Sequence, residues 1–327
     1  MTIALKIQKM LWGRAAMRCS HPDCRMDLFE DETDTDDPTL VGENCHMIAE
    51  GETGPRANTL VPIEQRNSYS NLILLCRNHH KVIDAQEGKY TLECLRKMKA
   101  DHEQWVKNQL GFDATKQKDD EYYAGLIDQW AKLANLDNWR NWSSWVLGGG
   151  QPSIPVSMDE NIEQLREWLL TRIWPGRYLE LESSFHNFRA VASDFQNCFR
   201  KHSKKREDGY LQTDKFYQLN TWNPELYDKL LIRFDHHVDL VQDLMLELTR
   251  AANLVCDRVR QYVLTSYRLS EGHLIVESGP TMDLTYKQYV VQFSPEECKE
   301  KYPYPGLEKF IDARTGRDVH FGEGTEP

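Results

Sequence analysis

The sequence contains no long apolar run, and this absence removes several classes of protein. No stretch of its 327 residues approaches the roughly 18 consecutive apolar residues of a membrane-spanning helix. The amino-terminal segment MTIALKIQKMLWGRAAMRCS scatters charges among its apolar residues and lacks the separate hydrophobic region of a signal peptide. No internal repeat is visible either. We therefore expect a protein that makes no membrane contact and is located in the cytoplasm.

Acidic residues outnumber basic ones, and the cysteines do not have the density of a disulfide-rich protein. The formal net charge is −11, which gives no evidence for nucleic-acid binding but leaves room for a local basic groove. The dense acidic run EDETDTDD, Glu30–Asp37, is typical of a solvated loop. Eight cysteines are too few for a disulfide scaffold in a chain of this length. They are unevenly placed, because five of them lie in the first hundred residues.

The chain length suggests about two domains, and the residue types indicate where they lie. Residues 1–112 contain the cysteine-rich region and several short apolar segments. The stretch GFDATKQKDDEYY is polar and has no apolar period, which is typical of a linker or of the entry to a helix, and we assign a linker to residues 113–122. Residues 123–327 are mostly helical in pattern. The predicted fold class is α+β, with a small mixed domain followed by a mainly α-helical domain.

The second domain contains two long apolar patterns with helical spacing. Apolar residues recur in steps of four and three from Leu181 to Phe199, and again from Tyr227 to Tyr262. The second pattern persists for about five heptads, as in a coiled-coil seam. It fits a helix packed inside its own bundle or a seam between two copies of the chain, so a homo-oligomer stays open. After Gly272, the segments HLIVES and YKQYVVQF predict a short β pair.

Two short segments in the first domain have the spacing of metal ligands. CSHPDC contains Cys19 and Cys24 with four residues between them, and CRNH contains Cys76 and His79 with two residues between them. Tetrahedral zinc takes four thiolate or imidazole ligands, which two short loops supply when the fold brings them together. The spacing therefore predicts a structural zinc site. Redox-active cysteines are the alternative, and His21 is an alternative zinc ligand.

A second group of residues has the types that phosphodiester hydrolysis requires. His80 follows His79 directly, and neighbouring side chains diverge, so His80 faces something other than the zinc. His46 and Asn71 lie upstream of it, and Asp84 lies four residues downstream. One imidazole removes a proton from water, and a second imidazole helps to hold a divalent ion against the phosphoryl charge. The asparagine amide holds the loop that carries the base, or ligates the ion.

These segments together resemble the HNH endonucleases, whose site is built on a ββα-metal motif. The resemblance extends over about Leu5 to Val106 and is carried by LKIQKMLWGRAAMRCSHPDC, GENCHMIAEGETGPR, YSNLILLCRNHHKVID and YTLECLRKMKADHE. It implies that His46 is the general base, Asn71 the central asparagine and His80 the metal-binding histidine. It also implies a structural zinc ion on Cys19, Cys24, Cys76 and His79, and a catalytic magnesium or manganese ion on His80, Asn71 and Asp84. Asp84 is either such a ligand or a helix-surface acid.

One position departs from the family pattern. Many HNH enzymes place aspartate or histidine directly before the base as an additional metal ligand, and this chain has Cys45 there. Magnesium prefers oxygen, so Cys45 is a poor ligand for it. The basic residues around the motif, Arg56, Arg66 and Lys81 with Arg77, are candidates for contacts with DNA phosphates.

The resemblance predicts a metal-dependent endonuclease that hydrolyses double-stranded DNA. Residues 123–327 are then expected to control it as a sensor, an oligomerisation element or a partner-binding domain. An HNH domain with such a tail resembles effectors of bacterial anti-phage defence, activated by a protein or a second messenger. The alternatives are a restriction or mobile-element nuclease whose tail reads DNA sequence, an enzyme with an RNA target, and a non-catalytic zinc-bound module that binds DNA or a partner.

Overall fold

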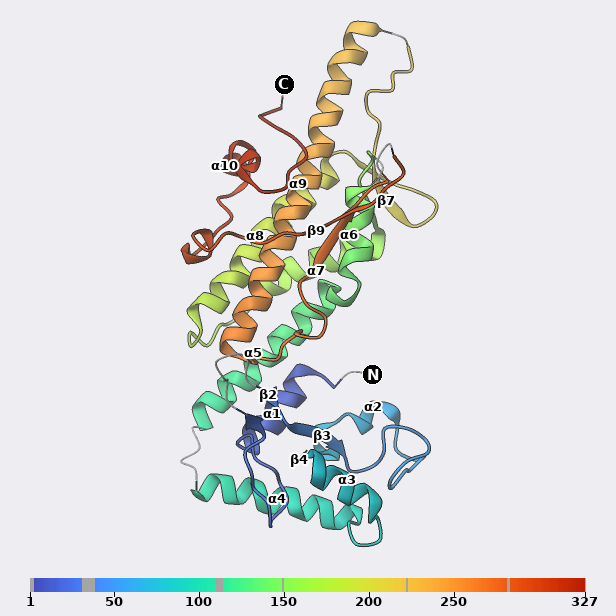
Figure 1. The fold of residues 1–327 in the computed structure, drawn as a ribbon. Coiled ribbons are helices and arrows are strands. Elements are labelled where there is room, and N and C mark those ends of the chain that lie inside the picture. Colours follow the sequence, from blue (N-terminus) through green and yellow to red (C-terminus); the bar gives the residue numbers. More distant parts are fainter. Residues whose placement is uncertain are drawn as a thin grey trace. The chain divides into compact units, whose positions relative to one another are not determined.

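The computed structural model describes residues 3–30, 39–109, 114–148, 150–221, 223–280 and 283–326. It combines helices with small sheets (Figure 1), which confirms the α+β class at this level. The chain divides into two compact units, Met1–Asp128 and Gln129–Pro327, which we call unit 1 and unit 2. No helix in the described ranges is both long enough and apolar enough to cross a membrane.

The predicted linker differs from what the structure contains. Helix α5, Ala114–Leu133, occupies residues 114–122 of it, and the division between the units falls inside this helix. Residue 113 lies outside the described residues. The apolar period is missing here because the buried side of the first turns is polar. Gln117 and Asp120 are both buried, and Lys9 forms an ion pair with Asp120 at 3.3 Å.

Unit 1 is built from short strands and helices around one small apolar core. Its central hairpin pairs β3 and β4 antiparallel, with His46 opposite Leu72 and Gly42 opposite Cys76. All five residues of β4, LILLC, are buried, and α3 follows β4 directly. The elements are α1 Leu5–Arg14, β1 Phe29–Glu30, β2 Thr39–Leu40, β3 Gly42–His46, α2 Ile63–Arg66, the 3-10 helix η1 Tyr69–Asn71, β4 Leu72–Cys76, α3 Arg77–Ala85 and α4 Leu92–Gln109.

Unit 2 is mainly helical and has two small sheets. Strands β5, β7 and β6 form one antiparallel sheet, and β8 and β9 form the other. The elements are η2 Leu136–Asn138, α6 Trp139–Leu147, β5 Ser153–Pro155, α7 Val156–Leu170, α8 Leu179–Lys201, β6 Ser203–Lys205, β7 Tyr210–Thr213, α9 Pro224–Tyr262, β8 Ile275–Ser278, β9 Lys287–Val290, η3 Glu297–Lys299, α10 Leu307–Ala313 and η4 Arg314–Gly316. The predicted β pair corresponds to β8 and β9.

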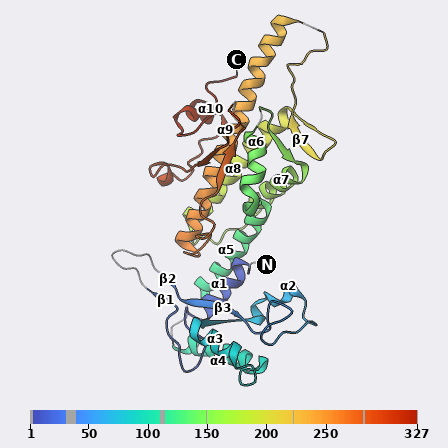
Figure 2. The ribbon, with the colours of Figure 1, turned by 45° about the vertical axis from the view of Figure 1, so that its right-hand side comes forward.

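Helix α9 is the central element of unit 2. Its amino terminus is capped by Asn223, whose side chain accepts a hydrogen bond from the Leu226 N–H, and Pro224 is its first residue. Every residue from 240 to 256 is buried, as expected for a helix surrounded on all sides. Helix α8 packs along it (Figures 1 and 2). The central part of the long apolar pattern is therefore covered within the chain itself.

Candidate functional site

Four predicted ligands from two distant segments come together in unit 1. The ligand atoms of Cys19, Cys24, Cys76 and His79 all lie within 4.8 Å of one another. Nδ1 of His79 lies 3.1 Å from Cys76 Sγ and 3.8 Å from Cys19 Sγ. This cluster could hold a metal ion, and its donors are compatible with structural zinc. In the described ranges no other group of histidine, cysteine and carboxylate side chains converges in this way.

Local backbone geometry explains why the two segments meet. Cys76 ends β4 and caps α3, because its Sγ accepts a hydrogen bond from the His79 N–H. The loop that carries Cys19 is tied to the same strand, since the Ser20 N–H donates to the Leu74 carbonyl at 2.9 Å. The Cys76 N–H in turn donates to Cys19 Sγ at 3.4 Å. The cluster thus joins the segment after α1 to the junction of β4 and α3.

Two other residues of this region, His21 and Cys45, lie outside the cluster. The His21 ring stacks on the His79 ring at 4.0 Å, and its Nε2 lies 3.2 Å from the Tyr90 hydroxyl. His21 therefore supports a ligand and is not one itself. Cys45 is completely buried and its thiol donates to the Glu43 carbonyl at 3.3 Å, while burial raises its pKa. It is held as a neutral thiol, which agrees with its being a poor ligand for magnesium.

Burial also affects the cluster itself. It raises the pKa of the Cys19 thiol to about 12, because a thiolate at this position loses its contact with water. A bound cation reverses this penalty, because it stabilises thiolates and releases their protons. The cluster is thus suited to a metal ion and unsuited to an empty, ionised state. All eight cysteines are free in the structure, and none forms a disulfide bond.

His80, although adjacent to His79, faces a different set of residues. Its Nδ1 lies 2.5 Å from a carboxylate oxygen of Glu43 on β3, and its Nε2 lies 3.2 Å from Asp84, one turn later on α3. The other Asp84 oxygen accepts a hydrogen bond from Arg56 at 2.6 Å. The two neighbouring histidines therefore lie in two chemically different environments. The first is sulfur-rich, and the second is made of carboxylates.

His46 is held by a separate partner. It is the last residue of β3, and its Nε2 lies 2.7 Å from Oδ1 of Asn67. The Asn67 amide nitrogen faces Glu50 at 3.5 Å, which leaves the amide oxygen for His46. Since that oxygen can only accept, Nε2 of His46 carries the proton and Nδ1 has a free lone pair. In the described ranges no hydrogen bond or ion pair joins His46 to His80 directly.

Asn71 is buried and fully committed to the backbone. Its amide nitrogen donates to the carbonyls of Ile48 and Arg66, at 2.9 and 2.8 Å, and its oxygen accepts from the Ile48 N–H at 2.9 Å. It fastens the segment that follows His46 to the turn before β4. Of the two roles expected for Asn71, holding the loop or ligating an ion, this geometry supports the first.

The predicted phosphate contacts separate into buried and exposed residues. Every guanidinium nitrogen of Arg56 donates within unit 1, to the carbonyls of Met47 and Ile83 and to Asp84. Arg66 is 3% exposed and donates to three backbone carbonyls. Both arginines therefore hold loops together, and this corrects their expected role. Lys81 is exposed and remains available to a ligand.

Glu43 and Asn67 complete the surroundings of the two histidines, and sequence reasoning did not single out either of them. Glu43 lies two residues before Cys45, so strand alternation places both on the side of β3 that α3 covers. Strand alternation in the sequence could therefore have indicated that Glu43 faces α3. Asn67 reaches His46 from the turn after α2, which no local pattern indicates. No family model matches the chain, and no curated protein matches it.

Proposed function

We propose that unit 1 is an HNH-type endonuclease that hydrolyses phosphodiester bonds in double-stranded DNA. The observation that carries this proposal is the divergence of two adjacent histidines at the start of α3. His79 points into the cysteine cluster, whereas His80 lies between two carboxylates. The order of hairpin and helix, β3, β4 and α3, matches a ββα-metal motif, with His46 at the end of the first strand.

The first ion is a structural zinc on Cys19, Cys24, Cys76 and His79. Ligand atoms on a tetrahedral zinc ion with three thiolates lie about 3.5 to 3.8 Å apart, given Zn–S distances of ~2.3 Å. The contacts of His79 with Cys76 and Cys19, 3.1 and 3.8 Å, lie close to this range. A zinc ion here fixes the β4–α3 junction, and so sets the position from which His80 projects.

His46 is the general base. Its Nδ1 lone pair accepts the proton of the attacking water, while Asn67 fixes the ring and its tautomer through Nε2. Asn71 positions this base from a distance, because it fastens the backbone at Ile48 just after His46. Both asparagines act on the orientation of the imidazole and not on the substrate.

The second ion, magnesium or manganese, is assigned to Nε2 of His80 with Asp84, and water and the substrate phosphate complete its ligands. Glu43 faces the other ring nitrogen, Nδ1, and so orients the imidazole without contacting the ion. Arg56 leaves one Asp84 oxygen on the His80 side, and the exposed Lys81 is placed to meet a phosphate. When bound, such an ion neutralises charge on the scissile phosphate and on the leaving oxygen. Unit 2 is assigned to control of the nuclease, as in an anti-phage effector.

The test is nicking of supercoiled plasmid by the full-length protein with magnesium or manganese. We expect cleavage by the wild type and a loss of about 100-fold or more in His46→Ala, the usual contribution of a general base. His320→Ala, at an exposed histidine of unit 2, is the matched control and should cleave like the wild type. Tight DNA binding without cleavage would support a non-catalytic module, and cleavage of RNA alone would change the substrate.

A paired comparison separates the two histidines. His80→Ala should retain one zinc per chain, measured by elemental analysis, and lose cleavage. His79→Ala should lose zinc and the folded structure of unit 1 together. Equal zinc contents in the two variants would contradict the assignment of different ions to the neighbouring side chains.

A further inference from the structure

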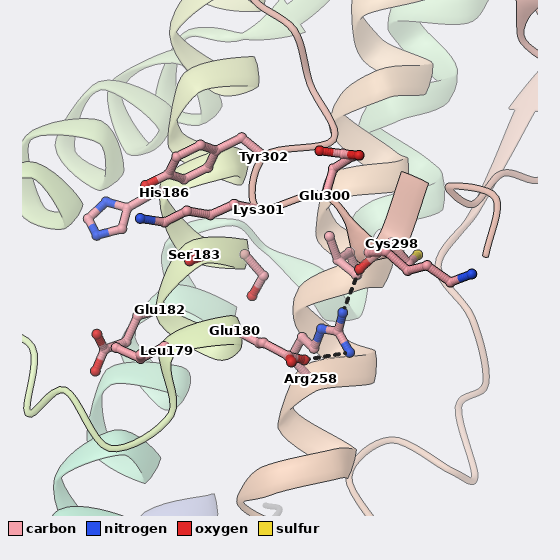
Figure 3. A pocket seen from close by; sticks show the side chains of 13 residues that line it. Leu179, Glu180, Glu182, Ser183, His186, Arg258, Cys298, Glu300, Lys301 and Tyr302 are labelled. Atoms are coloured by element: carbon pink, nitrogen blue, oxygen red, sulfur yellow. Dashed lines mark hydrogen bonds and ion pairs between the residues drawn. The ribbon is translucent and has the colours of Figure 1, made fainter. Parts of the chain in front are cut away.

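Unit 2 contains a cavity of about 770 Å³ that the proposed nuclease site does not use. Its walls are the first turns of α8, the α9 turn at Leu254 and Arg258, and the segment from Cys298 to Tyr302 (Figure 3). Cavities that bind small molecules typically measure about 300 to 1,000 Å³ and are lined by apolar groups with a few polar ones. This cavity has that size, but most of its lining residues are polar or charged, and Leu179 and Leu254 are its aliphatic members.

Arg258 holds the walls of the cavity together. One of its guanidinium nitrogens donates to the Cys298 carbonyl at 2.8 Å, and the other pairs with Glu180 of α8 at 3.1 Å. Figure 3 shows both contacts as dashed lines. The Glu180 carboxylate thus neutralises the charge of Arg258. Arg258 connects α8, α9 and the segment 298–302 without providing a free positive charge.

Two other positive side chains at the cavity, Lys299 and Lys301, differ from Arg258 in their ion pairing. In the described part of the chain no carboxylate lies within ion-pair distance of Lys299 or Lys301. Figure 3 shows Lys301 extending toward the His186 ring next to Tyr302, with the Glu300 carboxylate lying apart from them. Glu182 is occupied, since it accepts a hydrogen bond from the Gly176 N–H at 2.7 Å. Among the described residues Lys301 therefore has no ion-pair partner, whereas His186 lies in the field of the Glu182 carboxylate.

His186 lies among charged side chains of both signs. Burial lowers its pKa and the positive charge of Arg189 lowers it further, while the Glu182 carboxylate raises it and Lys301 lowers it. Nε of Arg189 is buried and has no hydrogen-bond partner in the structure. An anion next to Lys301 relieves the repulsion among these groups and allows His186 to donate a hydrogen bond.

Tyr302 gives the lining a flat aromatic surface. The Tyr302 ring is 48% exposed and lies under the cation of Lys301 at 5.2 Å, while Leu254 forms part of the buried floor. Aromatic side chains that are exposed in a cavity favour stacking against planar ligands. Positive charge and an aromatic surface therefore occur side by side.

We propose that this cavity binds a small organic anion with an aromatic ring, its anionic group between Lys301 and His186 and its ring against Tyr302. Two kinds of ligand have this combination of an anionic group and a planar ring. One is a nucleoside monophosphate, whose anionic group is a phosphate, and the other is an aromatic carboxylate. This site is independent of the nuclease assignment, since no residue of unit 1 takes part in it.

The experiment is isothermal titration calorimetry of the full-length protein with four probes: AMP, adenosine, inorganic phosphate and 4-aminobenzoate. Tighter binding of AMP than of adenosine and phosphate, by at least about tenfold, would support a phosphate ester as the ligand, because a charge-assisted hydrogen bond contributes about that factor. Binding of 4-aminobenzoate instead would support the carboxylate. If no probe bound at millimolar concentration, or if adenosine bound as well as AMP, the proposal would be overturned.

Variants locate the binding. Lys301→Gln should weaken the preferred anion by about tenfold or more, and Tyr302→Leu should weaken it while preserving the salt dependence. Lys309→Gln removes an exposed lysine of α10 that does not line the cavity and should bind like the wild type. Equal losses in Lys301→Gln and Lys309→Gln would show a general charge effect and contradict a site at this cavity.

Discussion

The two units place different chemistry at their centres. In unit 1, three cysteines and a histidine converge at the junction of β4 and α3. In unit 2, charged side chains meet along the buried middle of α9. A small unit with short strands has little apolar surface to bury, and a metal ion on the proposed site would compensate for this. A larger helical unit can surround ion pairs instead, provided that every charge finds a partner.

The ion pairs of unit 2 attach the end of the chain to α9. Arg314, which is fully buried, lies 3.2 Å from Asp243, and the N–H of Phe321 donates to the same carboxylate at 2.6 Å. One turn later, Glu247 pairs with Arg317 at 2.6 Å. Burial raises the pKa of both carboxyl groups, while the arginines lower it. Charges and backbone hydrogen bonds therefore help to hold the carboxyl-terminal segment on α9.

The largest expected effect is the loss of unit 1 alone when its metal ligands are removed. Structural zinc contributes about 10 kcal/mol or more to the folding of small zinc domains. We expect Cys76→Ser to abolish protection from hydrogen exchange throughout unit 1 and to leave α9 protected. Cys94→Ser, at an exposed cysteine outside the cluster, is the control. Equal protection of unit 1 in both variants would contradict the idea that unit 1, unlike unit 2, depends on a metal ion for its stability.

The next effect is specific to unit 2. Asp243→Ala leaves the buried Arg314 without its carboxylate, which typically costs about 3 to 5 kcal/mol of unfolding free energy. Asp228→Ala removes an exposed carboxylate from the same helix and should change stability by less than about 0.5 kcal/mol. Urea denaturation followed by far-ultraviolet circular dichroism measures both. A small change in Asp243→Ala would mean that the ion pairs are not essential to unit 2.

The smallest expected effect depends on pH and again concerns unit 2. Burial lowers the pKa of His237 to about 4, and His202, Lys201 and His236 lower it too, whereas Glu326 raises it. The unfolded chain takes up this proton near pH 6.5 and the folded chain only near pH 4. Stability is therefore lost as the pH falls through this window, by at most about 3 kcal/mol.

The variant His237→Gln isolates this contribution. Its stability should fall less than that of the wild type between pH 7 and pH 4, measured by urea denaturation of each at both values. The raised pKa of Asp239, about 6, has the opposite slope and cancels because both proteins contain it. His273→Gln, at an exposed histidine, should follow the wild type. Parallel pH profiles for wild type and His237→Gln would show that His237 is not the responsible group.

The features that the sequence predicted well are those with a local pattern. The four and three spacing from Tyr227 to Tyr262 indicated a helix, and α9 runs over Pro224–Tyr262. The short spacings within CSHPDC and CRNH identified four residues whose ligand atoms converge. Neighbouring residues set the geometry of the helix and of each pair of ligands, whereas the meeting of the two pairs depends on the contact of the Cys19 loop with β4.

Features that depend on distant backbone atoms were not visible in the sequence. Arg56 and Arg66 were expected to face DNA, but their partners are carbonyls supplied by other loops. Glu43 meets His80 because the β3–β4 register places the strand beside α3, over a separation of 37 residues. Buried polar groups likewise hid the start of α5, where Gln117 and Asp120 replace apolar residues.

The position of the cysteine cluster within the chain affects the order in which the protein matures. Its four ligands lie between residues 19 and 79, ahead of every element of unit 2. A nascent chain can therefore bring these four side chains together while α9 has not yet been translated. Unit 1 can then begin to fold without any residue of unit 2.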